Sequence, residues 1–402
     1  MSGREPVIGQ VPGELRDVVM DRALRPPKCR RAWVEVDLDA LAGNAAALQA
    51  ILPEPCKLMA VVKTDAYRHG AKRVALRLMR EGFDAFAVAS AREGADLRKE
   101  GLEGEVLVLG YTPHEDAWIL SGYELTQLVA DGVHAKSLNE TGFRLDIHIA
   151  VDTGLHRLGI EPANIDEIEA VYKCKNLRVT GVATHFASSD SLDDSDVDFT
   201  NLQIERYVSV LDYLRGRGYD TGKLHAQASF GILNYPDLKY DYARAGIAMY
   251  GVKSHYTHTV TEPDLQPVLS LKAIVAQVRW IGEAESVSYG RAFTSNKPLK
   301  LATVCAGYAD GIPRQISGKS LMCLIRGKRV PIIGRICMDL LMTDVSEVDS
   351  VAAGDIVTLI GKDVDDEIRC EEVADAAGTI TNDILCRLGK RLPRIYIEKT
   401  QC

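Results

Sequence analysis

The chain has 402 residues, of which 46 % are hydrophobic and 26 % are charged, and its formal net charge at pH 7 is −8. A chain of this length usually folds into more than one domain, and this composition is typical of globular proteins. The negative net charge, together with the absence of any run of five basic residues, argues against a general nucleic-acid-binding protein.

Residues 1–28 are predicted to be a tail or linker, because they show no sustained hydrophobic period and contain four prolines. The basic stretch 25–31 is compatible with a contact to a membrane surface or to a preceding domain, but a solvated tail is the simpler interpretation. No apolar run approaches the roughly 20 residues of a membrane helix. The nine cysteines are scattered and form no C-x-x-C pair, which favours reduced thiols in the cytoplasm.

Strand-like and helix-like segments alternate from residue 29 to about residue 264. Strand patterns occupy 32–36, 58–62, 85–89, 106–109, 125–130, 146–151, 179–183, 223–226 and 248–250. Helix patterns occupy 71–81, 91–100, 165–172 and 197–215, and one more, capped by Asp37 or Asp39, runs through Leu48. This alternation predicts parallel strands, in an open doubly wound sheet or in a closed (β/α)8 barrel. We favour the barrel, because polar residues follow many of the strands.

A second, mostly β domain is predicted over residues 265–402. The pattern changes near residues 263–267, after which 268–281 alternates without a helical period. Short apolar segments punctuated by glycine follow at 300–304, 321–325, 330–333 and 355–360, then a helix over 371–387 and a strand over 393–397. The predicted fold class is therefore α/β, a (β/α)8 barrel followed by a mostly β domain.

Lys63 ends the apolar strand 58–62, where a charged side chain is poorly placed for packing. A buried ammonium is costly, and condensation of the amine with an aldehyde cofactor removes its charge. The alternative is a lysine that extends from the strand end into solvent. The polar and aromatic residues that follow it at once, 67–70, favour the cofactor interpretation.

Four more polar residues come after or beside apolar runs of the barrel region: Arg157, His185, Ser229 and Arg244. Arg157 lies between two glycines, where it can donate to an oxyanion or simply cap its turn in water. His185 is a single histidine after an apolar run, which more often marks a core residue than a catalyst. Ser229 is suited either to capping a helix or to seating a phosphate.

The string from Val62 to Gly70 resembles the pyridoxal-phosphate attachment motif of the alanine racemase family, valine-lysine-x-x-alanine-tyrosine-x-histidine-glycine. Further strings similar to those of the family follow in the same order at 152–159, 244–251, 287–291, 306–311 and 334–339. The resemblance spans residues 32–397 and implies an isomerase that uses pyridoxal 5′-phosphate (PLP). It also implies a head-to-tail homodimer, in which each active site borrows the second domain of the partner subunit.

The resemblance implies a role for each candidate site residue in the barrel region. Lys63 binds PLP covalently, Arg157 contacts its phenolic oxygen and orients the substrate carboxylate, and Arg244, hydrogen-bonded by His185, points at the pyridine nitrogen. The phosphate is held by Tyr67, Ser229, Gly246 and Ile247. Because a guanidinium stays protonated, Arg244 donates a hydrogen bond to the ring nitrogen without handing it a proton, which restrains side reactions.

Two bases are implied, Lys63 for the D-enantiomer and Tyr289 of the partner subunit for the L-enantiomer. A tyrosine with its reference pKa near ~10 is a poor base at neutral pH, so Tyr289 needs a cationic neighbour. Met338 is expected beside the substrate carboxylate, and Tyr308 at the pocket entrance. No metal is expected, because zinc-dependent relatives need a His/Cys pair near the C-terminus and no histidine follows His258.

Two positions depart from the family pattern. Asn382 stands where most alanine racemases have a tyrosine beside the substrate methyl group, and it leaves room and a hydrogen-bond partner for a hydroxymethyl side chain. In this the chain resembles the serine/alanine racemases of vancomycin-resistance clusters, whose catalytic module often follows a membrane domain. Ala150 stands where many members have a carbamylated lysine that supports Arg157, so we expect a bound anion or another carboxylate to replace it.

The expected function is PLP-dependent racemisation of serine, alanine or both, with D-serine supplied to a vancomycin-resistant cell wall. A membrane domain before Met1 in a longer natural form is compatible with this expectation. The alternatives are an ordinary alanine racemase, a PLP-dependent decarboxylase with the same two-domain plan, and a non-catalytic PLP-binding module. The segment around Arg244 and Tyr289 resembles the racemase version, which disfavours the decarboxylase.

Overall fold

The computed structural model describes residues 31–398, so the tail predicted over 1–28 lies outside the described residues. The described chain divides into two compact units. The barrel unit comprises Val36–Leu269, Arg369–Gly389 and residues 396–398, and the sheet unit comprises residues 31–35, Ser270–Ile368 and Lys390–Ile395. Each unit therefore gathers segments that are far apart in the sequence.

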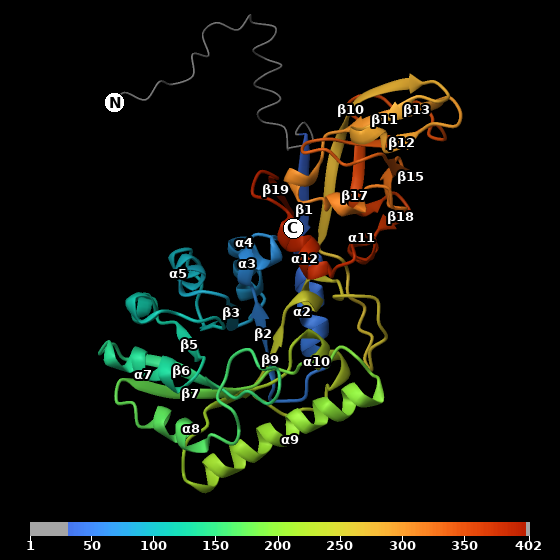
Figure 1. The fold of residues 1–402 in the computed structure, drawn as a ribbon. Helices are drawn as coiled ribbons and strands as arrows, with labels where there is room; N and C mark the ends of the chain where they lie inside the picture. The colour runs from blue at the N-terminus through green and yellow to red at the C-terminus, as the bar shows by residue number, and fades with distance from the viewer. Residues whose placement is uncertain (1–30, 399–402) are drawn as a thin grey trace, which may run out of the picture. The chain divides into compact units, whose positions relative to one another are not determined.

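The core of the barrel unit is a closed ring of eight parallel strands whose order follows the chain. Strands β2, β3, β5, β6, β7 and β9 of this ring are labelled in Figure 1. The strands are β2 (Lys57–Val61), β3 (Ala85–Val88), β4 (Glu105–Val108), β5 (Thr126–Val129), β6 (Leu145–Ala150), β7 (Leu177–Ala183), β8 (Lys223–His225) and β9 (Tyr242–Ala245). The ring closes where β9 pairs with β2 and Arg244 lies opposite Met59. The predicted barrel is confirmed. Since parallel strands end at one rim, the residues that follow them meet there.

Helices alternate with these strands. They are α2 (Leu38–Ala50), α3 (Lys63–Tyr67), α4 (Ala71–Arg80), α5 (Ala91–Lys99), α6 (Ala117–Gly122), α7 (Gly132–Glu140), α8 (Ile165–Tyr172), α9 (Asp194–Gly216) and α10 (Ser229–Asn234), with the 3-10 turns η2 (His114–Asp116) and η3 (Ile247–Tyr250). Asp37 caps α2, because its Oδ1 accepts from the N–H groups of Asp39 and Ala40, each at 2.9 Å. Within residues 31–398, none of the helices combines the length and the apolar character that a membrane crossing needs.

Two elements expected in the barrel series are placed differently. The segment 248–250 is part of the 3-10 turn η3, which Gly251 ends with a φ of 75°, and the last barrel strand β9 lies just before it. A short apolar run does not distinguish a strand from a buried helical turn. The first expected strand exists as β1 (Ala32–Asp37) but joins the sheet of the other unit. Its partners are distant in the chain, since Val34 N donates to Pro393 O at 2.9 Å.

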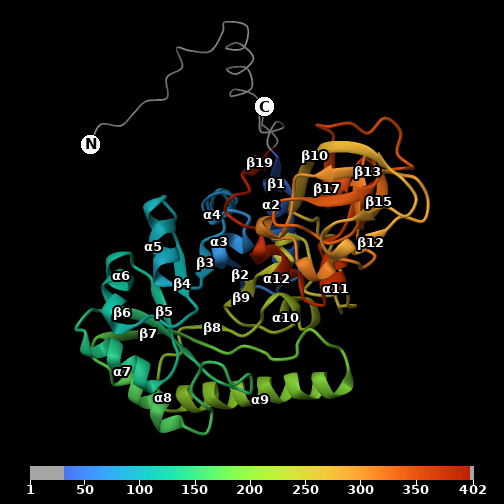
Figure 2. The ribbon, with the colours of Figure 1, turned by 45° about the horizontal axis from the view of Figure 1, so that its top comes forward.

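The sheet unit contains a nine-stranded sheet in the order β18-β17-β14-β15-β16-β13-β10-β1-β19, in which β17 also pairs with β10. Strands β10, β13, β15 and β17 of this sheet are labelled in Figure 2. The strands are β10 (Leu269–Ile281), β13 (Leu299–Val304), β14 (Met322–Ile325), β15 (Lys328–Ile333), β16 (Leu341–Asp344), β17 (Ile356–Asp363), β18 (Asp366–Ile368) and β19 (Arg394–Ile397). A small ribbon of β11 (Ser286–Val287) and β12 (Phe293–Thr294) and the 3-10 turns η4 (Tyr289–Arg291), η5 (Tyr308–Asp310) and η6 (Arg314–Ile316) complete it. The predicted, mostly β character of this region is confirmed.

The helix predicted over 371–387 is two helices, α11 (Cys370–Ala377) and α12 (Thr381–Arg387). Gly378, with a φ of 70°, ends the first of them, because glycine adopts this left-handed conformation without a steric cost. Both helices belong to the barrel unit. Thr381 holds the start of α12 there, since its N donates to Ser254 O at 3.1 Å and its Oγ1 donates to Lys253 O at 2.8 Å. Asn382 is thereby placed in the same unit as Lys63.

Candidate active site

Lys63 follows β2 at the rim where the barrel strands end, and the turn that it begins is left-handed. Five consecutive non-glycine residues, 64–68, have φ angles between 51° and 67°. Each such residue costs about 1–2 kcal/mol, so the turn persists because its surroundings hold it. Ala66 N donates to Val62 O at 2.9 Å, and Asp65 Oδ1 accepts from Ala71 N at 2.8 Å. The turn places Tyr67 beside Lys63 on one cavity.

The amine of Lys63 is partly buried, and its pKa is lowered from the ordinary value of a lysine. Desolvation is the largest cause, and the guanidinium groups of Arg157 and Arg244 add to it. Glu93 and Cys386 act in the opposite direction. A lowered pKa increases the neutral fraction of the amine, which is the form that attacks an aldehyde or accepts a proton.

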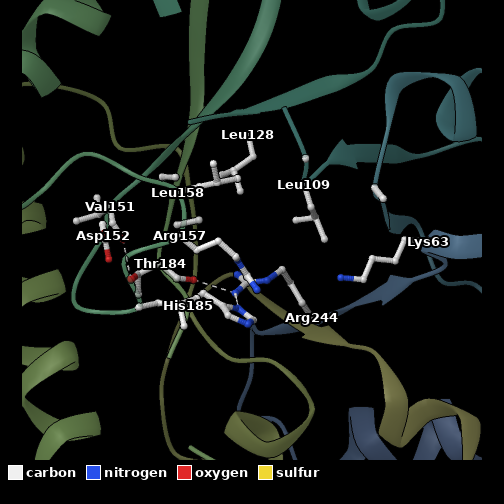
Figure 3. A pocket seen from close by; sticks show the side chains of 15 residues that line it. Lys63, Leu109, Leu128, Val151, Asp152, Arg157, Leu158, Thr184, His185 and Arg244 are labelled. Carbon is white, nitrogen blue, oxygen red and sulfur yellow. Dashed lines mark hydrogen bonds between the residues drawn. The ribbon is translucent and has the colours of Figure 1, made fainter. Parts of the chain in front are cut away.

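Two cavities meet at the rim, and Lys63, Leu109, His185 and Arg244 line both of them. The first, of about 350 Å³, is bordered also by Ala150, Asp152, Arg157 and Thr184. The second, of about 260 Å³, is bordered also by Tyr67, Ser229, Gly246, Ile247, Ser254 and Asn382. In Figure 3 the side chain of Lys63 points toward those of Arg244 and Arg157. The structure therefore brings together every site residue predicted within the barrel unit.

Arg244 is buried, and both ends of its guanidinium donate hydrogen bonds. Its Nη2 donates to Thr184 O at 2.8 Å, to Ala226 O at 2.9 Å and to His185 Nδ1 at 3.0 Å, and its Nη1 donates to His225 Nδ1. Burial lowers the pKa of Arg244 to about 10, which leaves it charged at neutral pH. Burial and the nearby cations lower the pKa of His185 to about 3, so His185 is a neutral acceptor. The hydrogen bond that the resemblance implies between these two residues is present.

Two histidines that the sequence analysis did not single out extend this network. His225 Nε2 lies 2.8 Å from His148 Nδ1, and His148 Nε2 lies 3.3 Å from Glu105 Oε1 in a contact too poorly aligned to count as a hydrogen bond. Because Arg244 only donates, His225 accepts at Nδ1 and carries its proton on Nε2, facing His148. Burial and Arg244 lower the pKa of His225 well below the ordinary value, which keeps it neutral. The only feature of the sequence that could have indicated these two histidines is their position in strands, His225 in β8 and His148 in β6.

Hydroxyl groups and backbone amides gather at the second cavity. Ser229 Oγ accepts from Gly246 N at 3.1 Å and from Ala248 N at 3.2 Å. Ile247 begins η3, so its N–H has no acceptor within that turn. A methyl group on Gly246 would lie 2.7 Å from Tyr67 Oη, so the space between them depends on the glycine. Such an array is suited to the oxygens of a phosphate.

The remaining predicted site residues, Tyr289, Tyr308 and Met338, lie in the sheet unit, where they are 67 %, 39 % and 53 % exposed. A methyl group on Gly290, the residue after Tyr289, would lie 2.9 Å from Arg335 Nη1, so the guanidinium of Arg335 lies beside the backbone of Gly290. Tyr308 N donates to Cys337 O at 3.0 Å, which joins the turns that carry Tyr308 and Met338. Their roles stay predictions.

Comparison with known proteins identifies the family. Residues 36–254 match the family model described as alanine racemase, N-terminal domain, and residues 268–396 match the model described as alanine racemase, C-terminal domain. The chain belongs to the alanine racemase family. Members of this family are PLP-dependent isomerases.

Relatives within the alanine racemase family resemble the chain over most of its length. An amino-acid racemase of Enterococcus faecalis is 40 % identical over 377 residues, which are 92 % of this chain and 53 % of that protein. A serine/alanine racemase of Enterococcus gallinarum is 38 % identical over 364 residues, 90 % of this chain and 51 % of that protein. The chain thus spans about half the length of these two relatives. The solved alanine racemase from Bartonella henselae with covalently bound pyridoxal phosphate is 28 % identical, with a TM-score of 0.81 over 92 % of this chain and all of that one (100 %).

The residues around the two cavities fit the cofactor of the alanine racemase family. Lys63 provides an amine for the aldehyde of PLP, and Arg244 provides a donor for its ring nitrogen. The space that a side chain on Gly246 would fill, beside the hydroxyls of Tyr67 and Ser229, suits the phosphate. The aldehyde, the ring nitrogen and the phosphate of PLP therefore each have a matching group in this chain.

The surroundings of Arg157 differ from those that the family resemblance implies. Its side chain is exposed and makes no hydrogen bond or ion pair with any residue between 31 and 398, and Ala150 on the same cavity has no polar group. Asp152 is already engaged, since its Oδ1 accepts from Gly154 N at 3.0 Å and from His156 N at 2.9 Å. Support of Arg157 by a bound anion or another carboxylate stays a prediction.

Asn382 borders the second cavity together with Lys63 and Tyr67. Ser254 Oγ donates to Asn382 Oδ1 at 2.8 Å. The amide nitrogen of Asn382 then points away from Ser254, and within residues 31–398 no acceptor engages it. A hydrogen-bond donor is therefore available at the position where most alanine racemases are expected to have a tyrosine.

Proposed function

We propose that this chain is a PLP-dependent racemase that interconverts the L- and D-forms of serine, of alanine, or of both. The observation that carries the proposal is the convergence of Lys63, Arg157 and Arg244 on two joined cavities, one of which has hydroxyls and amides for a phosphate. PLP, when bound, withdraws electrons from the substrate α-carbon and makes its proton acidic.

Lys63 Nζ takes the α-proton from one face of the substrate, and Tyr289 of the partner subunit gives a proton to the opposite face; in the reverse direction the two residues exchange these roles. The lowered pKa of Lys63 supports its role, because the neutral amine is the competent base. Arg157 binds the substrate carboxylate. Arg244 donates a hydrogen bond to the ring nitrogen and keeps its own proton, because its histidine neighbours are neutral and a guanidinium is a very weak acid. The electron withdrawal stays moderate, which favours return of the proton over side reactions.

The second base is Tyr289 of the partner subunit, in a head-to-tail homodimer with shared active sites. The exposure of Tyr289 and Met338 supports this arrangement, because a catalytic group that serves the site of another subunit must lie on the surface of its own. The guanidinium of Arg335 lies beside Gly290, the residue after Tyr289.

Serine is proposed as a substrate, and racemisation of alanine alone is the alternative. The free amide nitrogen of Asn382, held in orientation by Ser254, is able to donate to the substrate hydroxyl. A buried group that hydrogen-bonds a substrate hydroxyl discriminates against an analogue that lacks it. The Enterococcus relative named serine/alanine racemase supports this choice.

Asn382→Tyr is expected to lower the ratio of serine to alanine turnover by about tenfold or more, because the bulkier phenol fills the space for a hydroxymethyl group and removes its partner. The ratio of kcat/KM for L-serine to that for L-alanine measures the effect. The same substitution at the exposed Asn201 on α9 is the control. An unchanged ratio in Asn382→Tyr would show that this position does not select the substrate.

Gly246→Ala is expected to weaken PLP binding by about tenfold or more while leaving the protein folded, since the added methyl group enters the space beside Tyr67 Oη. Titration of the cofactor-stripped protein with PLP, followed by absorbance, measures the affinity. Gly216→Ala is the matched control, because a methyl group there meets nothing within 4 Å. Equal affinities for the two variants would place the phosphate elsewhere.

The direct test of the proposal is to incubate the PLP-loaded protein with L-serine and L-alanine separately and to follow each D-enantiomer by chiral chromatography. D-serine at a rate comparable to or above that of D-alanine supports the serine assignment. D-alanine alone indicates an ordinary alanine racemase. Decarboxylated product from a basic amino acid, or no product at all, would replace the proposal with the decarboxylase or the non-catalytic module.

The biological setting is proposed on the same grounds. The Enterococcus relative named serine/alanine racemase supports D-serine as a product, and supply of D-serine to a vancomycin-resistant cell wall stays a prediction from the sequence. A cytoplasmic location and a membrane domain in a longer natural form stay predictions from the sequence.

A further inference from the structure

Glu93, on α5, uses one carboxylate to hold the ends of two adjacent barrel strands. Its Oε1 accepts from Thr64 N at 2.8 Å, and Thr64 is the residue directly after Lys63. Its Oε2 accepts from Ala89 N at 2.7 Å, the first residue after β3. The backbone of Glu93 is itself anchored, because its N–H donates to the capping Ser90 Oγ at 3.3 Å. The peptide that joins Lys63 to its left-handed turn is therefore fixed by a side chain from the next helix.

The charge of Glu93 also reaches the Lys63 amine. Arg157, from the loop after β6, and Arg244, on β9, both disfavour a proton on Nζ, whereas Cys386, on α12, and Glu93 favour it. The Cys386 thiol does not supply a negative charge at neutral pH, because burial raises its pKa above the ordinary value. Glu93 is the carboxylate in this group. The neutral His185 lines both cavities, Asp152 also lines the first, and Tyr67 and Asp190 also line the second.

The conformation of residues 64–68 explains why the turn needs the hydrogen bond to Glu93. Residues 64–68 adopt a left-handed conformation that side chains disfavour, and their own hydrogen bonds leave the N–H of Thr64 at the start of the turn without a partner other than Glu93. A turn held only by its internal bonds would be free to relax toward a right-handed conformation, and such relaxation would displace the amine from the cavities.

We propose that Glu93 is a positioning residue for Lys63: one oxygen holds the peptide that follows the amine, and its charge stabilises the amine in its protonated form. This inference rests on the proposed function and deepens it, because a lysine that has taken the α-proton is a cation, which a nearby anion stabilises. Glu93 touches neither cofactor nor substrate in this role.

The test measures the rate at which PLP attaches to the full-length, cofactor-stripped protein as a function of pH, by absorbance. Borohydride reduction and mass spectrometry verify attachment at Lys63. The attachment rate of the wild-type protein rises with pH as the amine loses its proton. Glu93→Gln is expected to shift the midpoint of this rise to lower pH, since removal of a nearby negative charge favours the neutral amine.

The variant Glu93→Asp distinguishes the positional effect of Glu93 on the turn from the effect of its charge on the Lys63 amine. It keeps the carboxylate but shortens its reach by one methylene, so it is expected to slow attachment several-fold at an unchanged midpoint. Asp96→Asn is the matched control, because Asp96 is an exposed acid on the same helix that pairs with Lys99 at 3.0 Å. Its profile is expected to superimpose on that of the wild-type protein.

A Glu93→Gln profile that coincides with that of Asp96→Asn overturns the electrostatic part of the proposal. Wild-type attachment rates in Glu93→Asp overturn the positional part. If Glu93→Gln does not fold, as judged by circular dichroism, the Glu93→Asp rates decide alone. A wild-type protein that attaches PLP at Lys63 but racemises nothing refutes the proposed function and leaves this test of Glu93 standing.

Discussion

Lys63→Ala is expected to abolish covalent attachment of PLP and to lower kcat/KM for racemisation by about 10⁴-fold or more. The substitution removes both the amine that binds the aldehyde and the base on one face of the substrate, and no other lysine among residues 31–398 borders the two cavities. Attachment is measured by absorbance and by mass after borohydride reduction, and racemisation by chiral chromatography.

Lys57→Ala is the control for this experiment. Lys57 lies on the same strand, β2, but its exposed amine pairs with Asp84 at 2.6 Å on the surface. Its loss is expected to leave attachment and turnover within about twofold of wild type, because exposed ion pairs contribute little. Turnover in Lys63→Ala comparable to that of this control would remove Lys63 from the mechanism.

Tyr289→Phe is expected to lower kcat/KM by about 10²–10⁴-fold, the usual contribution of a general acid or base. The loss is expected to be equal in both directions, because the two enantiomers of an amino acid have the same free energy and the ratio of the two kcat/KM values cannot change. Covalent attachment of PLP is expected to stay intact, since Tyr289 lies outside the unit that carries Lys63.

Mixing the two inactive proteins tests whether the tyrosine acts on the partner's site. After subunit exchange between Lys63→Ala and Tyr289→Phe, half of the dimers are mixed, and each mixed dimer has one site with both bases. Activity is therefore expected to recover to about one quarter of that of the wild-type protein. A mixture that stays inactive although exchange is verified would show that both bases of a site come from one subunit.

The strand and helix series of the barrel could be read from the sequence because it depends on local patterns. Buried parallel strands are apolar runs, and the helices between them are polar on one side, so the rhythm itself indicates the architecture. The errors fell where the pattern is ambiguous or the partner is distant. The apolar run 248–250 suits both a strand and a buried turn, and β1 pairs with residues more than two hundred positions away.

The residues of the site also divide into those that the sequence indicates and those that only the structure identifies. Lys63 and Arg244 were recognisable because each lies in a string with unusual residue types at a strand end. Glu93 and His225 were not, because a glutamate in an exposed-looking helix and a histidine at the end of a short strand carry no local sign of their partners. Glu93 acquires its role only when the ends of β2 and β3 come within reach of one carboxylate.

The sequence by itself determined the family resemblance, the two kinds of domain and the residue types available for chemistry, since these depend on composition, periodicity and spacing. Only the tertiary structure decided that the segment with Asn382 returns to the barrel unit, that Arg244 is held through His225 and His148, and that the turn after Lys63 is left-handed and braced by Glu93. The physical reason is that hydrogen bonds and charges act over a few ångströms in space, whereas the groups that they join here lie tens to hundreds of residues apart in the chain.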